Sequence, residues 1–320
     1  MPNDSNRPDT AVITSAPAEP QRSNLSAHFS LVTVQALFGS LPVIAKIVLT
    51  QMSPVALVGF RIGITAVILF IFQLLRRRIF LQHRADYLCL AVLSIFGITL
   101  NQLLFIGGLS LTKAVNTSLL AVTIPIFTLG VGALAGRESV SGRKIFGIVL
   151  AAAGVLILID PRKASFSSET TIGDLLIVLN SLSYSIYVAF SKEVITRNGA
   201  FRSMMWVFIF AAAVCVPLGL WSFNSSGPAT VTGTTWLLVI YIAVGATAAT
   251  YLLNAFALSR LNASIVAVYI YLQPIIGFVL AAAVLREGIS FTFLAAAALV
   301  FAGVYLTTRR STPPEHLPAS

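Results

Sequence analysis

The chain alternates between long apolar stretches and short polar connections from residue 28 to residue 308. A membrane-spanning helix needs about 20 apolar residues in a row, and ten stretches come close to that length. They cover residues 28–49, 54–75, 87–108, 114–135, 142–160, 173–191, 203–223, 235–257, 263–285 and 290–308. These stretches are apolar around the whole helical circumference, unlike the one-sided stripe of a soluble helix. The pattern therefore predicts an all-α membrane protein with ten transmembrane helices.

A segment of the first half is repeated in the second. Residues 105–158 align without a gap on residues 254–307, at a spacing of 149 residues. The alignment pairs the rarer residues of the two copies: Pro125 with Pro274, Arg137-Glu138 with Arg286-Glu287, and Gly154-Val155 with Gly303-Val304. The first spans of the halves match at a spacing of 146 residues, which places Lys46 on Lys192. Internal repeats inside an apolar chain are typical of transporters.

The repeat divides the chain into two units of five spans each. The first covers residues 28–160 and the second 173–309, with a polar linker at 161–172 and polar tails at 1–27 and 310–320. Because five is odd, the second unit enters the membrane from the opposite side. The pattern predicts two inverted five-helix repeats, an architecture that permits alternating access.

The composition and the placement of charge support a membrane location. The chain is 57% hydrophobic and only 10% charged, with a mean hydropathy of +0.90, whereas soluble domains carry about 25% charged residues. The net charge of +10 would suit a nucleic-acid partner, but the basic residues lie between apolar spans. We therefore predict a lipid bilayer as the surroundings and no nucleic-acid partner. Cys89 and Cys215 lie in apolar stretches, so no disulfide framework is expected.

Counting Lys and Arg in the loops gives the orientation. With the N-terminus in the cytoplasm, fifteen of them fall inside and four fall outside, the four being Lys113, Arg162, Lys163 and Arg286. Positive residues concentrate on the cytoplasmic side of membrane proteins. Residues 1–27 lack the basic and then apolar pattern of a signal peptide and predict a disordered cytoplasmic tail. We expect a multi-pass protein of the cell inner membrane with both termini in the cytoplasm.

Short motifs follow one another in a defined order. The first half carries Phe38-Gly39-Ser40, Lys46, Pro54, Arg61, Asn101-Gln102-Leu103-Leu104-Phe105, Ala114, Pro125, Glu138, Gly147 and Gly154-Val155, and the second carries Gly173-Asp174-Leu175-Leu176, Tyr184-Ser185-Ile186-Tyr187, Ala263, Gln273-Pro274, Glu287 and Gly303-Val304. In order and spacing the chain resembles the EamA-type branch of the drug/metabolite transporter superfamily. The resemblance implies ten helices, a central cavity between the halves, and export or exchange of small metabolites such as amino acids. Phe38 stands where the family often has Trp, and both are large aromatic residues. Span 263–285 lacks the basic residues of phosphate-translocating relatives, which disfavours phosphorylated substrates.

Two basic side chains lie within spans. Arg61 is seven residues into the second span, about 10 Å along the helix. It could bind a carboxylate or act as a gate; alternatively it could pair with an acid such as Glu287 or Asp174, or extend its stem to the interface. Lys46 ends the first span and would either steer substrate and gate, or anchor the helix at the interface.

No acidic residue and no histidine lies in the middle of a span. A carboxylate or imidazole inside the membrane is the usual proton relay of a pump. The absence of such a residue from the middle of the spans disfavours proton-for-cation antiport and favours a solute that is neutral or zwitterionic at neutral pH.

Polar and aromatic side chains within spans are candidates for a substrate cavity. An amide in lipid leaves its donors and acceptors unpaired, so these residues should face the interior, where they join helices or line a cavity. Tyrosines combine an apolar ring with a hydroxyl, and packing is the alternative to cavity lining. The candidates are Asn101, Gln102, Asn116, Asn180, Tyr184, Tyr187, Tyr251, Asn254, Tyr269 and Gln273.

Prolines within spans are candidates for hinges or gates. Pro125 and Pro274 occupy matched places, and Pro42 lies in the first span. Proline removes a helical hydrogen bond and kinks the helix, with plain packing as the alternative. Glu138 and Glu287 precede the last helix of each repeat, and we expect them to brace the turn near a helix N-terminus.

The sequence thus predicts a carrier of small organic metabolites, amino acids or their relatives, by alternating access. A drug exporter and a channel-like pore are the alternatives. We expect no enzyme activity, no cofactor and no metal, because the chain has no paired carboxylates at metal spacing, no His cluster and no Gly-rich phosphate loop. The pattern makes no prediction of the oligomeric state.

Overall fold

The computed structural model describes residues 24–112, 117, 120–159, 170–225, 231–276 and 291–308. Over these ranges the chain is helical and contains no strand. The prediction of an all-α protein is confirmed. Six helical stretches of the described residues are long and apolar enough to cross a membrane, and two of them, Arg84–Leu111 and Gly233–Leu258, each join several labelled elements.

The first half contains α1 (Leu25–Val48), α2 (Pro54–Leu75), α3 (Arg84–Ser94), the π-helix η1 (Ile95–Leu100), α4 (Asn101–Leu111), α6 (Thr123–Leu134) and α7 (Gly142–Ile159). The α3–η1–α4 stretch runs as one continuous rod over Arg84–Leu111. Ser53 caps α2 by accepting a hydrogen bond from the Ala56 amide at 3.2 Å, and Pro54 follows at the first helical position, where its missing N–H costs nothing. Gly136, with a φ of 66°, turns the chain between α6 and α7.

The second half contains α8 (Thr171–Asn198), α9 (Ala200–Ser225), α10 (Gly233–Ala243), the π-helix η3 (Val244–Ala249), α11 (Thr250–Leu258), α12 (Ala263–Val268), the 3₁₀ segment η4 (Tyr269–Tyr271) and α14 (Phe291–Thr308). Gly199, with a φ of 83°, separates α8 from α9. The hydroxyl of Thr232 caps α10 by accepting from the Thr235 amide. Glycine and hydroxyl caps thus set the boundaries of these helices.

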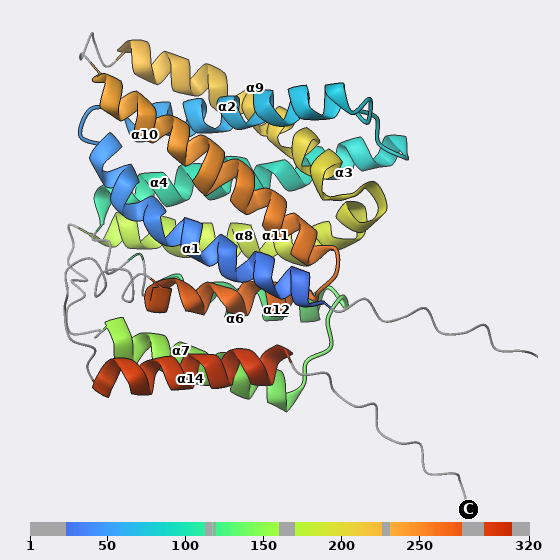
Figure 1. Ribbon diagram of the computed structural model, residues 1–320, viewed down its shortest axis with the longest axis vertical. Coiled ribbons are helices and arrows are strands. Elements are labelled where there is room, and N and C mark those ends of the chain that lie inside the picture. The colour runs from blue at the N-terminus through green and yellow to red at the C-terminus, as the bar shows by residue number, and fades with distance from the viewer. Residues whose placement is uncertain are drawn as a thin grey trace, which may run out of the picture.

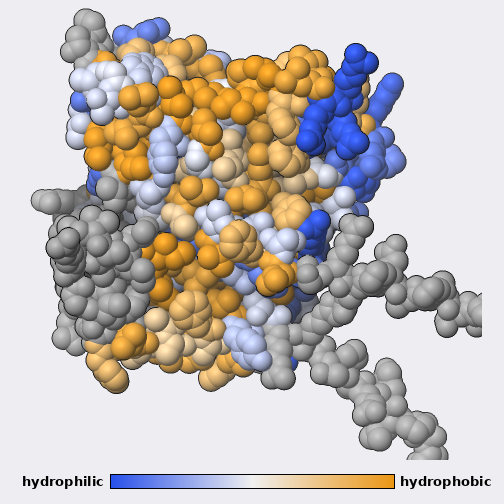
Figure 2. Space-filling view, viewed as in Figure 1, coloured by the Kyte–Doolittle hydropathy of each residue, from blue (hydrophilic) through white to orange (hydrophobic). Residues whose placement is uncertain are grey.

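The outer surface of the bundle is apolar. Leu134 is 92% exposed and Phe291 is 85% exposed, and Figure 2 shows hydrophobic residues over most of the visible side of the bundle. Exposed arginines, Arg76–Arg78 and Arg84, lie at the end of the bundle where α2 ends and α3 begins. The described chain also begins and ends there, at α1 and α14 (Figure 1). An apolar side with charge at the end suits helices that face lipid.

Glycines allow two helix pairs to approach closely. A Cβ on Gly59 of α2 would lie 2.7 Å from the Gly219 Cα of α9. On α14, a Cβ on Gly303 would lie 2.4 Å from the Gly147 carbonyl oxygen of α7. In Figure 1, α7 and α14 lie side by side at one edge of the bundle. Small residues at such crossings let the helix backbones pack against each other.

Irregular segments recur at the spacing of the sequence repeat. The π-helices η1 and η3 begin at Ile95 and Val244, which are 149 residues apart. A turn at residues 121–122, just before α6, is matched by the η4 segment at residues 270–271. π-Helical turns frequently mark functional sites. The periodicity of apolar residues does not reveal them.

The structure changes the interpretation of the matched prolines. Pro125 is the third residue of α6, in the first turn, so it begins a helix after a break rather than bending a continuous one. Pro274 follows η4 by one turn, next to a comparable irregularity. Pro42 falls within the bounds of α1, and its side chain lies outside the described part.

Candidate functional site

A cavity lies among α1, α4, α6, α8, α11 and the α12–η4 segment. Its volume is about 110 Å³, below the 300–1,000 Å³ typical of ligand pockets, and its size suits a solute of few heavy atoms. The apolar lining residues are Val34, Phe38, Leu41, Phe105, Ala121, Ile124, Ile177, Val266 and Ile270. The polar lining residues are Gln35, Asn101, Gln102, Thr117, Asn180, Ser181, Tyr184, Tyr251, Asn254 and Gln273. An apolar wall with a few placed amides and hydroxyls is typical of a small-molecule site.

Seven of the candidates from the sequence line this cavity: Asn101, Gln102, Asn180, Tyr184, Tyr251, Asn254 and Gln273. Asn116 lies outside the described residues. Tyr187 and Tyr269 are not among the lining residues. Sequence reasoning missed Gln35, which is 2% exposed and accepts a hydrogen bond from Gln273 Nε2 at 2.9 Å. Gln35 is an amide in the middle of an apolar span, so the rule that selected the other amides would have found it.

The first polar cluster joins the two halves of the chain. The Tyr251 hydroxyl donates to Asn101 Oδ1 at 3.0 Å, and Gln102 Nε2 donates to the Tyr251 hydroxyl at 2.6 Å. Gln102 and Tyr251 are 149 residues apart, so equivalent positions of the repeat meet here. Asn180 Nδ2 donates to the Asn101 carbonyl at 2.7 Å. These bonds fix the orientation of three amides at the cavity wall.

The π-helices supply backbone acceptors to these side chains. The Tyr251 hydroxyl also lies 3.2 Å from the Gly97 carbonyl oxygen, and Ser183 donates to the Phe96 carbonyl at 2.7 Å. Both carbonyls belong to η1. Immediately before the second π-helix, Thr65 donates to the carbonyl of Ala243, the last residue of α10, at 2.9 Å. Carbonyl groups in η1 and next to η3 therefore attach neighbouring helices.

A second polar pair also lines the cavity. Asn254 Nδ2 donates to the Tyr184 hydroxyl. Two amide oxygens of the lining, Gln102 Oε1 and Asn254 Oδ1, are buried and accept no hydrogen bond among the described residues. A buried acceptor without a donor is unfavourable by about 1–3 kcal/mol. Both oxygens belong to residues that line the cavity, which makes them candidate acceptors for N–H or O–H groups of a ligand.

The two remaining tyrosines have other partners. Tyr187 packs against Gly97, where an added Cβ would lie 2.5 Å from the tyrosine Cγ, and its hydroxyl donates to Met204 Sδ at 3.5 Å. The Tyr269 hydroxyl is 2.6 Å from His28 Nδ1 at the start of α1. Their positions correspond to the packing alternative.

Arg61 contacts a threonine of the second half, while Glu287, one of the acids expected to pair with it, lies outside the described residues. The Arg61 side chain is fully buried, so its stem does not extend to the interface, and no described carboxylate pairs with it. Its Nε and Nη2 donate to Thr247 Oγ1 in η3 at 3.0 and 2.8 Å. Asp174 instead accepts from the Thr112 hydroxyl at 2.6 Å. The sequence pattern does not identify Thr247 as the partner, because Arg61 and Thr247 are 186 residues apart and meet only when α2 packs against η3.

The two lysines at matched positions make matched contacts. Lys46 Nζ donates to the Thr112 carbonyl at 3.1 Å, at the end of α4. Lys192 Nζ donates to Asn262 Oδ1 at 3.0 Å, just after α11. Neither residue is among those lining the cavity. Lys46 connects the first helix of its half to the end of the third, whereas Lys192 connects α8 to the residue that precedes α12.

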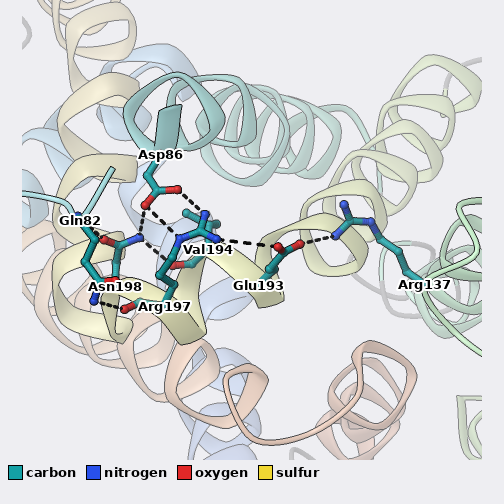
Figure 3. Close-up of polar contacts among 7 residues, drawn as sticks. All are labelled: Gln82, Asp86, Arg137, Glu193, Val194, Arg197 and Asn198. Carbon is teal, nitrogen blue, oxygen red and sulfur yellow. Dashed lines mark hydrogen bonds and ion pairs between the residues drawn. The ribbon is translucent and has the colours of Figure 1, made fainter. Parts of the chain in front are cut away.

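Ion pairs cluster at the arginine-rich end of the bundle, away from the cavity lining. Asp86 of α3 pairs with Arg197 of α8 and accepts from Asn198 Nδ2 at 2.8 Å (Figure 3). Glu193 continues the chain of charges, 3.8 Å from Arg197 and 3.7 Å from Arg137. Asp86 is 1% exposed. These contacts hold α3, α8 and the α6–α7 turn together.

Glu138 makes a separate contact between the halves. It accepts from Lys144 Nζ at 3.0 Å and from the Ser264 amide at 3.1 Å, and it also binds the Ser264 hydroxyl. The carboxylate thus lies at the N-terminus of α12, where negative charge is favourable. Its matched residue, Glu287, lies outside the described residues.

Apolar helices around a buried cavity with amide and hydroxyl groups define a helical membrane transport protein. The family model of the EamA-like transporter family matches residues 25–160 and again residues 171–309. The chain belongs to this family.

Relatives of the chain are named as transporters. It is 25% identical over 288 residues to an uncharacterized transporter of Archaeoglobus fulgidus, covering 90% of this chain and 99% of the relative. It is 21% identical over 302 residues to the uncharacterized transporter YetK of Bacillus subtilis, covering 93% and 92%. It is 29% identical over 189 residues to a Salmonella typhimurium protein named "Probable amino-acid metabolite efflux pump", covering 56% and 62%.

One solved crystal structure shares the fold. It superposes with a TM-score of 0.72 at 19% sequence identity, covering 89% of this chain and 96% of the other. This similarity concerns the fold alone.

Proposed function

We propose that this protein carries amino acids or related small zwitterionic metabolites across the cell inner membrane, by export or exchange. The observation that carries the proposal is the pair of unsatisfied amide oxygens, Gln102 Oε1 and Asn254 Oδ1, on residues that line the cavity. An ammonium group has three hydrogen-bond donors and can donate to amide oxygens of this kind. The similarity to the Salmonella protein named as an amino-acid metabolite efflux pump supports this substrate class.

The proposed architecture is ten transmembrane helices in two inverted repeats, residues 28–160 and 173–309, with both termini in the cytoplasm. The 149-residue spacing between η1 and η3 supports a repeat that extends to irregular backbone. The contact between equivalent residues Gln102 and Tyr251 supports a pseudo-twofold relation near the cavity. Halves related in this way could exchange conformations and so open the cavity to alternate sides.

The test is exchange in liposomes that contain the purified protein. Vesicles preloaded with one unlabelled amino acid at a time would receive an external labelled amino acid without a proton gradient. Saturable acceleration by a subset of preloaded amino acids is the expected result. Absence of exchange for every amino acid would reject the substrate class, and sugars, nucleobases and cationic drugs would then be tested in the same vesicles.

The same experiment separates the two alternatives. A channel-like pore would conduct without acceleration by the preloaded solute. A drug exporter would exchange organic cations instead of amino acids. The described lining contains no Asp or Glu to attract a cation, which favours the amino-acid proposal.

A further inference from the structure

Arg61 is a buried positive charge without a described counter-ion. The side chain is 0% exposed in α2. The described carboxylates have other partners: Asp86 binds Arg197, Glu138 binds Lys144, Glu193 lies near Arg137 and Asp174 binds Thr112. A charge inside a membrane is unfavourable unless it is paired, and such a residue is by default a candidate for function.

Among the described residues, Arg61 contacts no negatively charged group. Two of its nitrogens donate hydrogen bonds to one neutral oxygen, Thr247 Oγ1. The Thr247 hydroxyl itself donates a hydrogen bond to the Ile242 carbonyl at 2.7 Å. The third nitrogen, Nη1, is buried and has no partner among the described residues. Thr247 is itself fully buried. Within the described part of the chain, the guanidinium is therefore held in place by neutral oxygen only.

The charge lies behind the wall of the cavity. Thr247 precedes Tyr251 by four residues, about one helical turn. Arg61 therefore binds the same continuous helix, α10–η3–α11, whose residue Tyr251 lines the cavity. The polar groups that line the cavity are neutral amides and hydroxyls. In a medium of low polarity a charge acts over a longer distance than in water, because solvent and salt screen it less.

We propose that Arg61 makes the cavity selective for solutes that carry a carboxylate. The guanidinium supplies a positive potential through the Tyr251 wall, while the unpaired oxygens of Gln102 and Asn254 receive the ammonium group of the same solute. This inference rests on the proposed function and deepens it, because it assigns the recognition of the solute's carboxylate to Arg61. Arg61 is a specificity-determining residue that acts at a distance.

The test compares an amino acid with its own carboxamide, which keeps the ammonium group and loses the carboxylate. Alanine, serine and threonine and their carboxamides, which are small enough for the cavity, would compete against the labelled amino acid in the exchange assay. We expect the wild-type protein to prefer each transported amino acid to its amide by about tenfold or more. R61K keeps a charge and should keep most of that preference. R61Q should bring the ratio close to one while exchange of the amide persists.

A second pair of variants leaves Arg61 in place. T247D would put a carboxylate where Arg61 already binds an oxygen and so would neutralise the guanidinium, whereas T247N has nearly the same size and no charge. We expect T247D to lose the carboxylate preference and T247N to keep it. This comparison remains informative if R61Q does not fold.

The outcomes separate this inference from the proposed function. If the wild-type protein exchanges amino acids and both R61Q and T247D keep the wild-type ratio, the role of Arg61 is wrong and the amino-acid function stands. If the wild-type protein exchanges other carboxylates and both variants lose that preference, the role of Arg61 stands and the amino-acid class is wrong. A wild-type protein that exchanges only solutes without a carboxylate would overturn both.

Discussion

Tyr184 and Tyr187 lie one helical turn apart on α8 and have different surroundings. Tyr184 lines the cavity and accepts a hydrogen bond from Asn254, whereas Tyr187 packs against Gly97 and Met204. Each residue carries the same ring and the same hydroxyl. The pair therefore offers a matched comparison between a lining residue and a packing residue on one helix.

We predict that Y184F weakens exchange and that Y187F does not. Removing the Tyr184 hydroxyl leaves the Asn254 amide without its partner, and a net hydrogen bond is worth about 1 kcal/mol. The half-saturation concentration for exchange should rise about fivefold in Y184F and stay within about twofold in Y187F. The measurement is the concentration dependence of exchange in liposomes. Equal effects of the two substitutions would contradict the assignment of Tyr184 to the site.

The rule that amides within apolar spans face the interior led from sequence to much of the cavity lining. It placed Asn101, Asn180 and Asn254 there, and Gln35 obeys it as well. The same reasoning could not separate Tyr184 from Tyr187, because their roles depend on neighbours from other helices. The burial of Arg61 depends likewise on Thr247, a residue 186 positions away.

Arg197 offers a second comparison at the residue scale, because two acids bind it in different surroundings. Asp86 has a side chain that is 2% exposed, while that of Glu193 is 70% exposed. Exposed ion pairs contribute about 0–1 kcal/mol, and breaking a buried pair is far more destabilising. We predict that D86N lowers the apparent melting temperature in detergent by several degrees, and that E193Q changes it by about a degree or less. A larger effect of E193Q than of D86N would contradict the role of burial.

At the scale of elements, the π-helices and glycine crossings are the features that sequence periodicity did not predict. A π-helical turn changes the helical phase by one residue, and a span that is apolar on all sides gives no signal of that change. The matched positions of η1 and η3 show that the repeat conserves this irregularity. The Gly154-Val155 and Gly303-Val304 match was visible in the sequence, but its physical reason is the crossing of α7 and α14. There, a Cβ on Gly154 would lie 2.7 Å from the Ala296 carbonyl oxygen, and one on Gly303 would lie 2.4 Å from that of Gly147.

We predict that G303A destabilises the protein although alanine favours helices. The new methyl group would meet the backbone of α7, which can yield only if the helices separate, and such overpacking costs about 1–3 kcal/mol. G130A is the control, because a Cβ at that helical position meets nothing within 4 Å. Thermal unfolding in detergent should show a lower apparent melting temperature for G303A and an unchanged or higher one for G130A. A melting temperature of G303A equal to that of the wild-type protein would rule out a tight crossing.

At the scale of the whole molecule, equivalent contacts link the two halves at different places. Arg197, in the last turn of α8, binds Asp86 in the first turn of α3. At the spacings of the repeat, 146 and 149 residues, the counterparts are Gln51 after α1 and Thr235 in the first turn of α10. Gln51 Oε1 does accept from Thr235 Oγ1, at 3.0 Å. Asp86 and Thr235 lie outside the segments aligned from the sequence, and only the packed helices show that both pairs are in contact.

This pairing leads to a prediction about alternating access. If the halves exchange conformations between the two states, a contact present in both halves of one state is present in both states. The Gln51–Thr235 and Asp86–Arg197 contacts should then persist throughout transport and serve as fixed points around which other elements move.

We therefore predict that joining Gln51 to Thr235 covalently leaves exchange intact. The variant would carry Q51C and T235C in a background with C89S and C215A, since Cys89 and Cys215 are free. A short thiol-specific cross-linker would join the pair in liposomes, with each single-cysteine variant as the control for modification alone. Exchange should stay within about twofold of the untreated protein, because a fixed contact loses nothing by being made permanent. Loss of exchange on cross-linking, with recovery after the linker is cleaved, would show that this contact opens during the cycle and would contradict the symmetric mechanism.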